Sequence, residues 1–187
     1  MNDFIFELRR KLVHILSAFY LFIYYFTDKI FGQDEAILIL VFFLVILSFA
    51  EFLRIKYSVK IPLFERLYRE NEKNNLSGSV YLLIGIIIAL SAFDFNIASA
   101  AILMAIFGDT ASALIGKRIG FKAKFIAEFI VDVAVGFIFL NNLLIIIAMA
   151  FTATVVEIGL KSIDDNLAIP VAAGLAGQIL AILMKIL

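Results

Sequence analysis

Apolar residues form long continuous runs along this chain, and short polar segments separate them. Residues 36–50, 76–93, 133–156 and 167–184 contain no charged side chain. A helix that crosses a bilayer needs about 20 predominantly apolar residues. A shorter apolar run can still cross when polar side chains at its ends extend to the membrane surface. The pattern therefore predicts an all-α, polytopic membrane protein.

The boundaries of these runs predict seven transmembrane helices. We place them at 11–27, 35–53, 77–93, 96–116, 124–140, 142–160 and 168–187. The run at 133–156 is divided because Asn141-Asn142 favours a turn, and because Glu128 and Glu157 on its two sides are too far apart for one crossing. No repeat or second domain is visible, so we interpret 1–187 as a single integral membrane catalytic domain.

The segment between the second and third predicted helices has a pattern of its own. Leu63, Phe64, Leu67 and Tyr68 recur at helical spacing with charged residues between them. This pattern predicts an amphipathic helix that lies on the membrane surface.

Positive charge is unevenly divided between the two faces that this topology creates. Every lysine and arginine except Lys29 and Lys185 falls on one face. Cytoplasmic loops carry an excess of Lys and Arg, so the N-terminus is predicted to lie in the cytoplasm.

Composition narrows the chemistry that is open to the chain. The 187 residues are 64% hydrophobic, with a mean hydropathy of +1.06, one histidine, no cysteine and no net charge. Disulfides, thiolate chemistry and His/Cys metal clusters are therefore excluded. Any metal would be a hard cation bound by carboxylates.

Ionisable residues gather at the predicted cytoplasmic ends of the helices. In the segment ELRRKLVH, the residues Glu7, Arg10, Lys11 and His14 share one helical face. They are candidates for phosphate binding or acid–base chemistry, with side chains that reach the membrane interface as the alternative. Ionisable groups at membrane depth are costly, so we expect them to line one polar cavity that opens to the cytoplasm.

The segment GDTASALIGKRIG places an aspartate ahead of a basic, glycine-rich turn. Its flexible and charged residues are Gly108, Asp109, Gly116, Lys117, Arg118 and Gly120. Glycines let a backbone approach a phosphate, and the two cations would neutralise its charge. Asp109 would then hold a divalent cation bound to those phosphates. We predict a nucleoside triphosphate site, although the P-loop pattern is absent.

Glu128 and Asp132 form a candidate metal site or a proton-sharing pair, and a second acidic cluster precedes the last predicted helix. Glu128 and Asp132 are four residues apart, so they share one helical face, and such close acids repel unless a cation or proton lies between them. Asp164, Asp165 and Asn166 precede the last predicted helix, where capping explains one of them but not the cluster.

Taken in order, these segments resemble a known family. E-x-x-R-K-x-x-H, the G-D segment with its G-K-x-x-G end, and E…D-D-N-L-x-I-P are similar to motifs of the CTP-dependent polyprenol and lipid kinases. That family includes dolichol kinase, phytol kinase and CTP-dependent diacylglycerol kinase. The G-D segment is also similar to phosphatidate cytidylyltransferases.

The resemblance implies roles for individual residues. Asp109, Lys117 and Gly120 match the nucleotide-phosphate site, and Asp165 and Asn166 match a nucleotide or metal site. The remaining matches are Arg10, Lys11 and His14 in the N-terminal signature and Glu157 as the acid before D-D-N-L.

One family element is altered in this chain. Where the family has K-[ST]-x-E-G-[ST], Lys124 and Glu128 can stand for the lysine and the acid, but Phe129 and Ile130 replace the Gly and the Ser/Thr. We hypothesise that Asp132 compensates as a metal ligand.

The resemblance implies a kinase that uses CTP and Mg²⁺ to phosphorylate the hydroxyl of a membrane lipid alcohol, such as a polyprenol, a dolichol or diacylglycerol. We assign the catalytic role to Asp109, His14, Glu128 and Lys117, and metal binding to Asp109, Glu128, Asp132 and Asp165. Nucleotide binding is assigned to Arg10, Lys11, Gly108, Gly116, Lys117, Gly120, Lys124, Asp165 and Asn166.

The alternatives are cytidylyl transfer from CTP to a lipid phosphate, and an inactive or transport-type relative. The expected partners are the bilayer and the lipid, with no nucleic acid. The compact chain suits a prokaryotic plasma membrane with the active site facing the cytoplasm, and the oligomeric state stays open.

Overall fold

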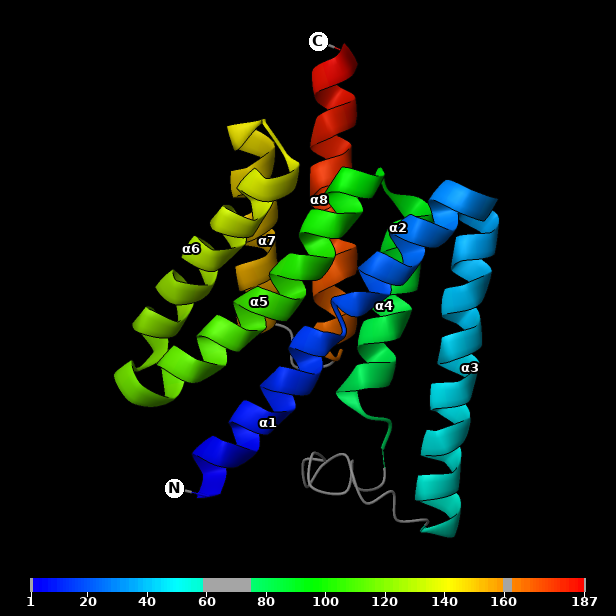
Figure 1. Cartoon of the computed structure of the whole chain (residues 1–187). Helices are drawn as coiled ribbons and strands as arrows, with labels where there is room; N and C mark the ends of the chain where they lie inside the picture. The colour runs from blue at the N-terminus through cyan, green and yellow to red at the C-terminus, as the bar shows by residue number, and fades with distance from the viewer. Residues whose placement is uncertain (1, 59–74, 160–162, 187) are drawn as a thin grey trace. The chain divides into compact units, whose positions relative to one another are not determined.

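The structure, a computed structural model, describes residues 2–58, 75–159 and 163–186, with the backbone alone at 2–7, 116–119 and 186. These residues form helices and, within the described ranges, no strand, which confirms the all-α prediction (Figure 1). The helices are α1 (Asn2–Leu16), α2 (Phe19–Phe31), α3 (Gln33–Tyr57), α4 (Gly78–Ala92), α5 (Phe95–Ile119), α6 (Phe121–Phe139), α7 (Leu143–Gly159) and α8 (Asp165–Ile186). The amphipathic helix predicted near Leu63–Tyr68 lies outside the described residues.

The chain divides into two compact units, Met1–Ile84 and Gly85–Leu187. In the first unit, α2 packs against α3. The second unit holds α5 to α8, which run up and down in succession (Figure 1). The interpretation of the whole chain as one catalytic domain stays a prediction.

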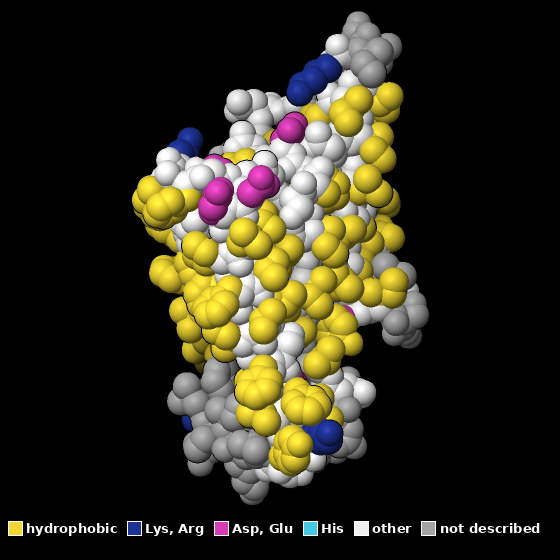
Figure 2. Space-filling model, turned by 90° about the vertical axis from the view of Figure 1, so that its right-hand side faces the viewer, with side chains coloured by type: hydrophobic (Ala, Val, Ile, Leu, Met, Phe, Trp, Pro, Cys, Tyr) yellow, Lys and Arg dark blue, Asp and Glu magenta, His cyan; other side chains and the backbone are white. Residues whose placement is uncertain are grey.

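Three helices of the described chain are long and apolar enough to cross a membrane, judged by length and composition. They are Gln33–Tyr57, Phe95–Ile115 and Asp165–Lys185, and two shorter apolar helices are Gly78–Ala92 and Leu143–Gly159. Large apolar side chains are also exposed, such as Phe42 at 63% and Phe49 at 60%. Figure 2 shows hydrophobic side chains over much of the displayed face. A surface of this kind is expected in contact with lipid, which indicates a membrane protein.

The prediction of one continuous transmembrane helix over 11–27 is wrong. The structure divides it at Ser17 and Ala18, between α1 and α2. Their backbone N–H groups bond to the carbonyls three residues earlier, at His14 and Ile15, which is the tighter 3₁₀ pattern. Ser17 Oγ also donates to the Val13 carbonyl at 3.4 Å, a contact that favours bending. A continuous apolar run contains no sign of this break.

The predicted break at Asn141-Asn142 is confirmed, because α6 ends at Phe139 and α7 begins at Leu143. Asn142 explains where α7 starts. Its Oδ1 accepts hydrogen bonds from the backbone N–H groups of Leu144 (3.0 Å) and Ile145 (3.3 Å), as a helix N-cap does.

Helix α5 forms the centre of the second unit and contacts α6, α7 and α8. Its buried face includes Ala100, Ala101, Met104 and Ala105. Small side chains on such a face let neighbouring helices approach closely. This close packing brings polar residues of α5, α6, α7 and α8 together.

Replacement of Asn142 by alanine is expected to destabilise the protein by about 1 kcal/mol, because two N–H groups of the first turn of α7 lose their acceptor. Thermal unfolding in detergent measures the effect, and Asn141→Ala is the control because Asn141 is exposed in the same turn. Equal midpoints for the two variants would contradict the capping role of Asn142.

Candidate functional site

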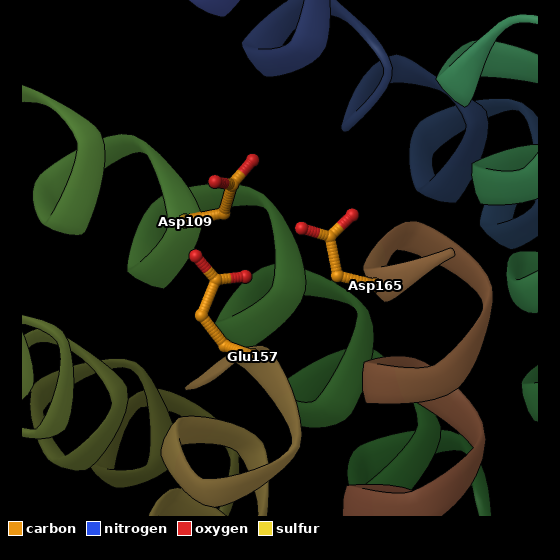
Figure 3. A group of neighbouring side chains, drawn as sticks. All are labelled: Asp109, Glu157 and Asp165. Carbon is orange, nitrogen blue, oxygen red and sulfur yellow. The ribbon is translucent and has the colours of Figure 1, made fainter. Parts of the chain in front are cut away.

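Three acidic side chains from three helices meet in the second unit. Asp109 of α5, Glu157 of α7 and Asp165 of α8 each bring a carboxylate oxygen within 4.8 Å of the others (Figure 3). Glu157 lies in the last turn of α7 and Asp165 is the first residue of α8. Helices that alternate in direction bring these ends to the same side, so the site follows from the topology of the unit.

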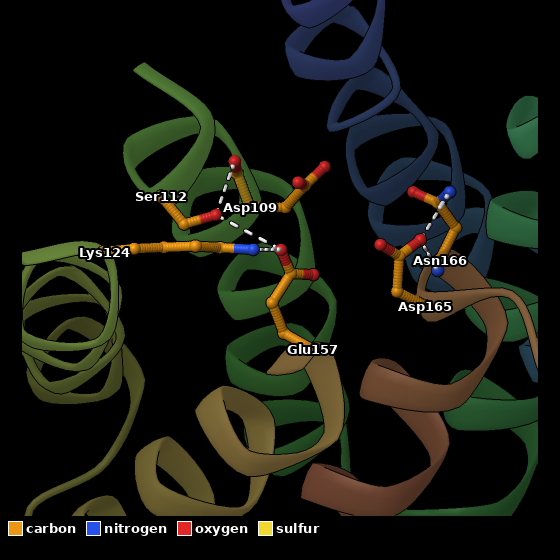
Figure 4. Close-up of polar contacts among 6 residues, drawn as sticks. All are labelled: Asp109, Ser112, Lys124, Glu157, Asp165 and Asn166. Atoms are coloured by element: carbon orange, nitrogen blue, oxygen red, sulfur yellow. Dashed lines mark hydrogen bonds and ion pairs between the residues drawn. The ribbon is translucent and has the colours of Figure 1, made fainter. Parts of the chain in front are cut away.

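Glu157 is held in place through one of its two oxygens. Its Oε1 accepts a hydrogen bond from Ser112 Oγ at 3.2 Å and lies 3.0 Å from the ammonium nitrogen of Lys124. Its Oε2 is buried and has no hydrogen-bond partner within the described residues. In Figure 4 this second oxygen points toward Asp165. Two neighbours therefore fix the carboxylate and leave one oxygen available at the site.

Asp165 is held in a similar way by the residue that follows it. The backbone N–H and the side-chain Nδ2 of Asn166 donate to Asp165 Oδ1 at 2.9 Å and 3.2 Å. The same amide group also donates to Asp164 Oδ1 at 2.8 Å. Asn166 thus orients both aspartates at the start of α8, where the helix dipole favours negative charge.

The donor set fits a hard divalent cation. Asp109, Glu157 and Asp165 supply carboxylate oxygens, which Mg²⁺ and related ions prefer. Carboxylates this close repel one another when charged, and Lys124 offsets part of that repulsion. Glu157 Oε2, which has no hydrogen-bond partner among the described residues, is a buried acceptor of the kind that a bound cation would satisfy.

Glu128 and Asp132 were also predicted to bind metal, but they lie outside this group of three. Both are buried in α6, with exposures of 1% and 0%. Glu128 Oε2 and Asp132 Oδ1 have no hydrogen-bond partner in the part of the chain described here, and Thr154 Oγ1 lies 3.5 Å from Asp132 Oδ2. Their assignment as metal ligands stays a prediction.

Gly108 was predicted to bind nucleotide, and the structure gives its lack of a side chain another reason. A Cβ atom built on Gly108 would overlap Asp132 Oδ1. The glycine therefore makes room for a buried carboxylate where α5 packs against α6.

Gly120 has a conformational role at the turn between α5 and α6. Its φ of 103° is in the region that favours glycine, and α6 begins at the next residue. Lys124, in the first turn of α6, is the predicted nucleotide-binding lysine that the structure brings to the site. The backbones of Gly116 and Lys117 belong to α5, but their side chains are not described.

The N-terminal candidates belong to the other compact unit. Arg10, Lys11 and His14 lie on α1, within Met1–Ile84, whereas the three acidic residues lie within Gly85–Leu187. Their roles in nucleotide binding and catalysis stay predictions.

The sequence analysis did not identify Ser112 as a site residue. A signal was present in its spacing. Ser112 follows Asp109 by three residues, so the two share one helical face. A hydroxyl on the face of a candidate metal ligand is a candidate to support the site.

Replacement of Gly108 by alanine is expected to destabilise the protein by about 1–3 kcal/mol, since the new methyl group overlaps the Asp132 carboxylate. Thermal unfolding in detergent measures the loss. Gly159→Ala is the matched control, because a Cβ atom there meets nothing within 4 Å. The loss of stability caused by Gly108→Ala should be smaller when Asp132 is also replaced by alanine. An equal loss of stability in the presence of Asp132→Ala would contradict the steric explanation.

Comparison with curated proteins gives a relative that itself has no described function. The chain is 28% identical over 196 residues to a protein of Rickettsia prowazekii (strain Madrid E) described as uncharacterized protein RP860, and the match covers 91% of this chain and 93% of that protein. No family model matches the chain. No solved structure matches it.

Proposed function

We propose that this protein is a CTP-dependent kinase that phosphorylates the hydroxyl of a membrane lipid alcohol. The observation that carries the proposal is the convergence of Asp109, Glu157 and Asp165 with Lys124 at their edge. Phosphoryl transfer from a nucleotide needs divalent cations and basic groups around the phosphates more than it needs covalent chemistry from the protein. The motif order described above supports CTP as the donor.

The divalent cation, which we propose to be Mg²⁺, would be held by the carboxylates of Asp109, Glu157 and Asp165. When bound, the cation would neutralise charge on the β- and γ-phosphates. Ser112 and Lys124 keep Glu157 oriented for this role. Asn166 does the same for Asp165.

Lys124 is suited to bind phosphate, because its side chain keeps 30% of its surface exposed whereas that of Glu157 keeps 4%. An ammonium group that reaches solvent from the edge of a cation site can contact a nucleotide phosphate. Lys117, Arg10 and Lys11 would add positive charge from the motifs that resemble the kinase family. Glu128 or His14 would orient or accept the proton of the alcohol.

We also propose the finer topology. Seven membrane crossings, with the first of them formed by the divided segment α1–α2, would place the N-terminus and the carboxylate site at the cytoplasmic face of a prokaryotic plasma membrane. The uneven distribution of lysine and arginine supports this orientation. The lipid would enter sideways between helices, while CTP would arrive from the cytoplasm.

Purified protein in detergent, given γ-³²P-labelled CTP, Mg²⁺ and a panel of lipid alcohols, is expected to label one class of lipid. Asp109→Asn should lower the rate by about 100-fold or more, because the site loses a charged ligand of the cation. Asp94→Asn is the matched control. It makes the same chemical change at the residue before α5, where the Asp94 carboxylate accepts a hydrogen bond from Gln178.

The outcomes of this assay separate the alternatives. Label in the lipid that survives Asp109→Asn would contradict the role of the carboxylate site. No transfer from CTP to any alcohol, together with formation of a CDP-lipid from α-labelled CTP and a lipid phosphate, would establish cytidylyl transfer instead. Absence of both reactions would favour an inactive or transport-type relative.

The orientation can be tested by single-cysteine labelling, because the natural chain has no cysteine. In intact cells, an impermeant maleimide is expected to label Asn141→Cys, in the turn between α6 and α7, but not Tyr57→Cys at the end of α3. Both positions should react after the cells are lysed. The reverse pattern of labelling would contradict the proposed orientation.

A further inference from the structure

We propose that Ser112 is a positioning residue of the carboxylate site, which fixes Glu157 so that its second oxygen faces the cation. The inference deepens the proposed function and rests on the same cation site. Ser112 belongs to α5 and Glu157 to α7, so the contact joins two helices of the second unit (Figure 4).

The hydroxyl of Ser112 lies within hydrogen-bond distance of two acceptors. Its Oγ lies 3.2 Å from Glu157 Oε1 and 3.1 Å from the backbone carbonyl oxygen of Asp109. A hydroxyl has a single hydrogen to donate, and a bond to an ionised carboxylate is roughly twice as strong as one between neutral groups. The hydrogen is therefore directed to Glu157 when that residue is charged.

Burial makes this contact hard to replace. Ser112 is completely buried, at 0% exposure, so water cannot take over its role as donor. Leaving a buried carboxylate oxygen without that donor costs free energy and allows the side chain to rotate. A rotated Glu157 would no longer present Oε2, the oxygen that has no partner within the described residues.

The second donor to Glu157 does not make Ser112 redundant. Lys124 contacts the same Oε1 at 3.0 Å, but it comes from α6 and its side chain is partly exposed. If Lys124 turns to a nucleotide phosphate, it leaves Glu157. Ser112 then keeps the carboxylate in place during the step in which the cation site is used.

Ser112 also links two of the three ligands. It lies one helical turn beyond Asp109 on α5, so the same turn carries one ligand and orients another. Neighbours that orient metal ligands in this way affect metal affinity by about 10–100-fold in other proteins.

The test measures Mn²⁺ binding to the purified full chain in detergent, by the electron paramagnetic resonance signal of free Mn²⁺, without nucleotide or lipid. Mn²⁺ is chosen because it prefers the same oxygen ligands as Mg²⁺. Ser112→Ala is expected to raise the Kd about tenfold. Ser112→Cys should act similarly, because a thiol has the same shape with a slightly larger atom and donates only weakly.

The matched control is Ser99→Ala, the same substitution in the same helix. Ser99 is buried at 1% exposure, and its hydroxyl has no hydrogen-bond partner in the part of the chain that is described. Its Mn²⁺ affinity should equal that of the natural protein. Thermal unfolding of each variant shows whether the fold is retained.

A double variant tests whether Ser112 acts through Glu157. With Glu157→Ala already present, the change Ser112→Ala should weaken Mn²⁺ binding no further. Additive losses, or equal losses for Ser99→Ala and Ser112→Ala, would overturn the positioning role, as would a natural protein that binds no Mn²⁺. Because no CTP or lipid is present, failure of the kinase assay leaves this result unchanged, and the two proposals can fail separately.

Discussion

The cost of placing carboxylates among apolar helices is the constraint on which the second unit depends. Glu128 and Asp132 are almost completely buried, and Asp109 is 9% exposed. Such groups are stable only if donors, protons or cations compensate for the lost water. The structure provides Lys124 and Ser112 to Glu157, and Asn166 to Asp165. A bound cation is the compensation that would satisfy the three carboxylates together.

Close packing of the helices brings the residues of the site together. Gly108 leaves space for the Asp132 carboxylate, and Gly136 lets Ile146 approach the backbone of α6, with a methyl carbon 2.6 Å from where a Cβ atom would be. Residues with larger side chains at these points would push the helices apart. Lys124 of α6 would then move away from Glu157 of α7. The small residues near the site therefore contribute to its chemistry through geometry.

The candidate site was only partly predictable from the sequence. Asp109 and Asp165 were predicted as metal ligands, and the structure places their carboxylates together. The resemblance identified Glu157 only as the acid before D-D-N-L, without a metal-binding role. The sequence of its helix does not show which residues of the neighbouring helices it faces. Glu128 and Asp132 were predicted to bind metal because they share one helical face. Their spacing along one helix does not show which other helices approach that face. Binding of a metal or of CTP stays a prediction for all five.

By itself, the sequence determined the helical class, the apolar segments that suit a membrane and the break at Asn141-Asn142, because hydrophobic runs and turn residues are local properties. It did not reveal the division of the first predicted helix at Ser17, since backbone hydrogen bonds of the 3₁₀ type leave no trace in an apolar run. Only the tertiary structure decided which acids meet and that Ser112 supports Glu157. Contacts between helices depend on their rotation and separation, and these are set by packing across the whole unit.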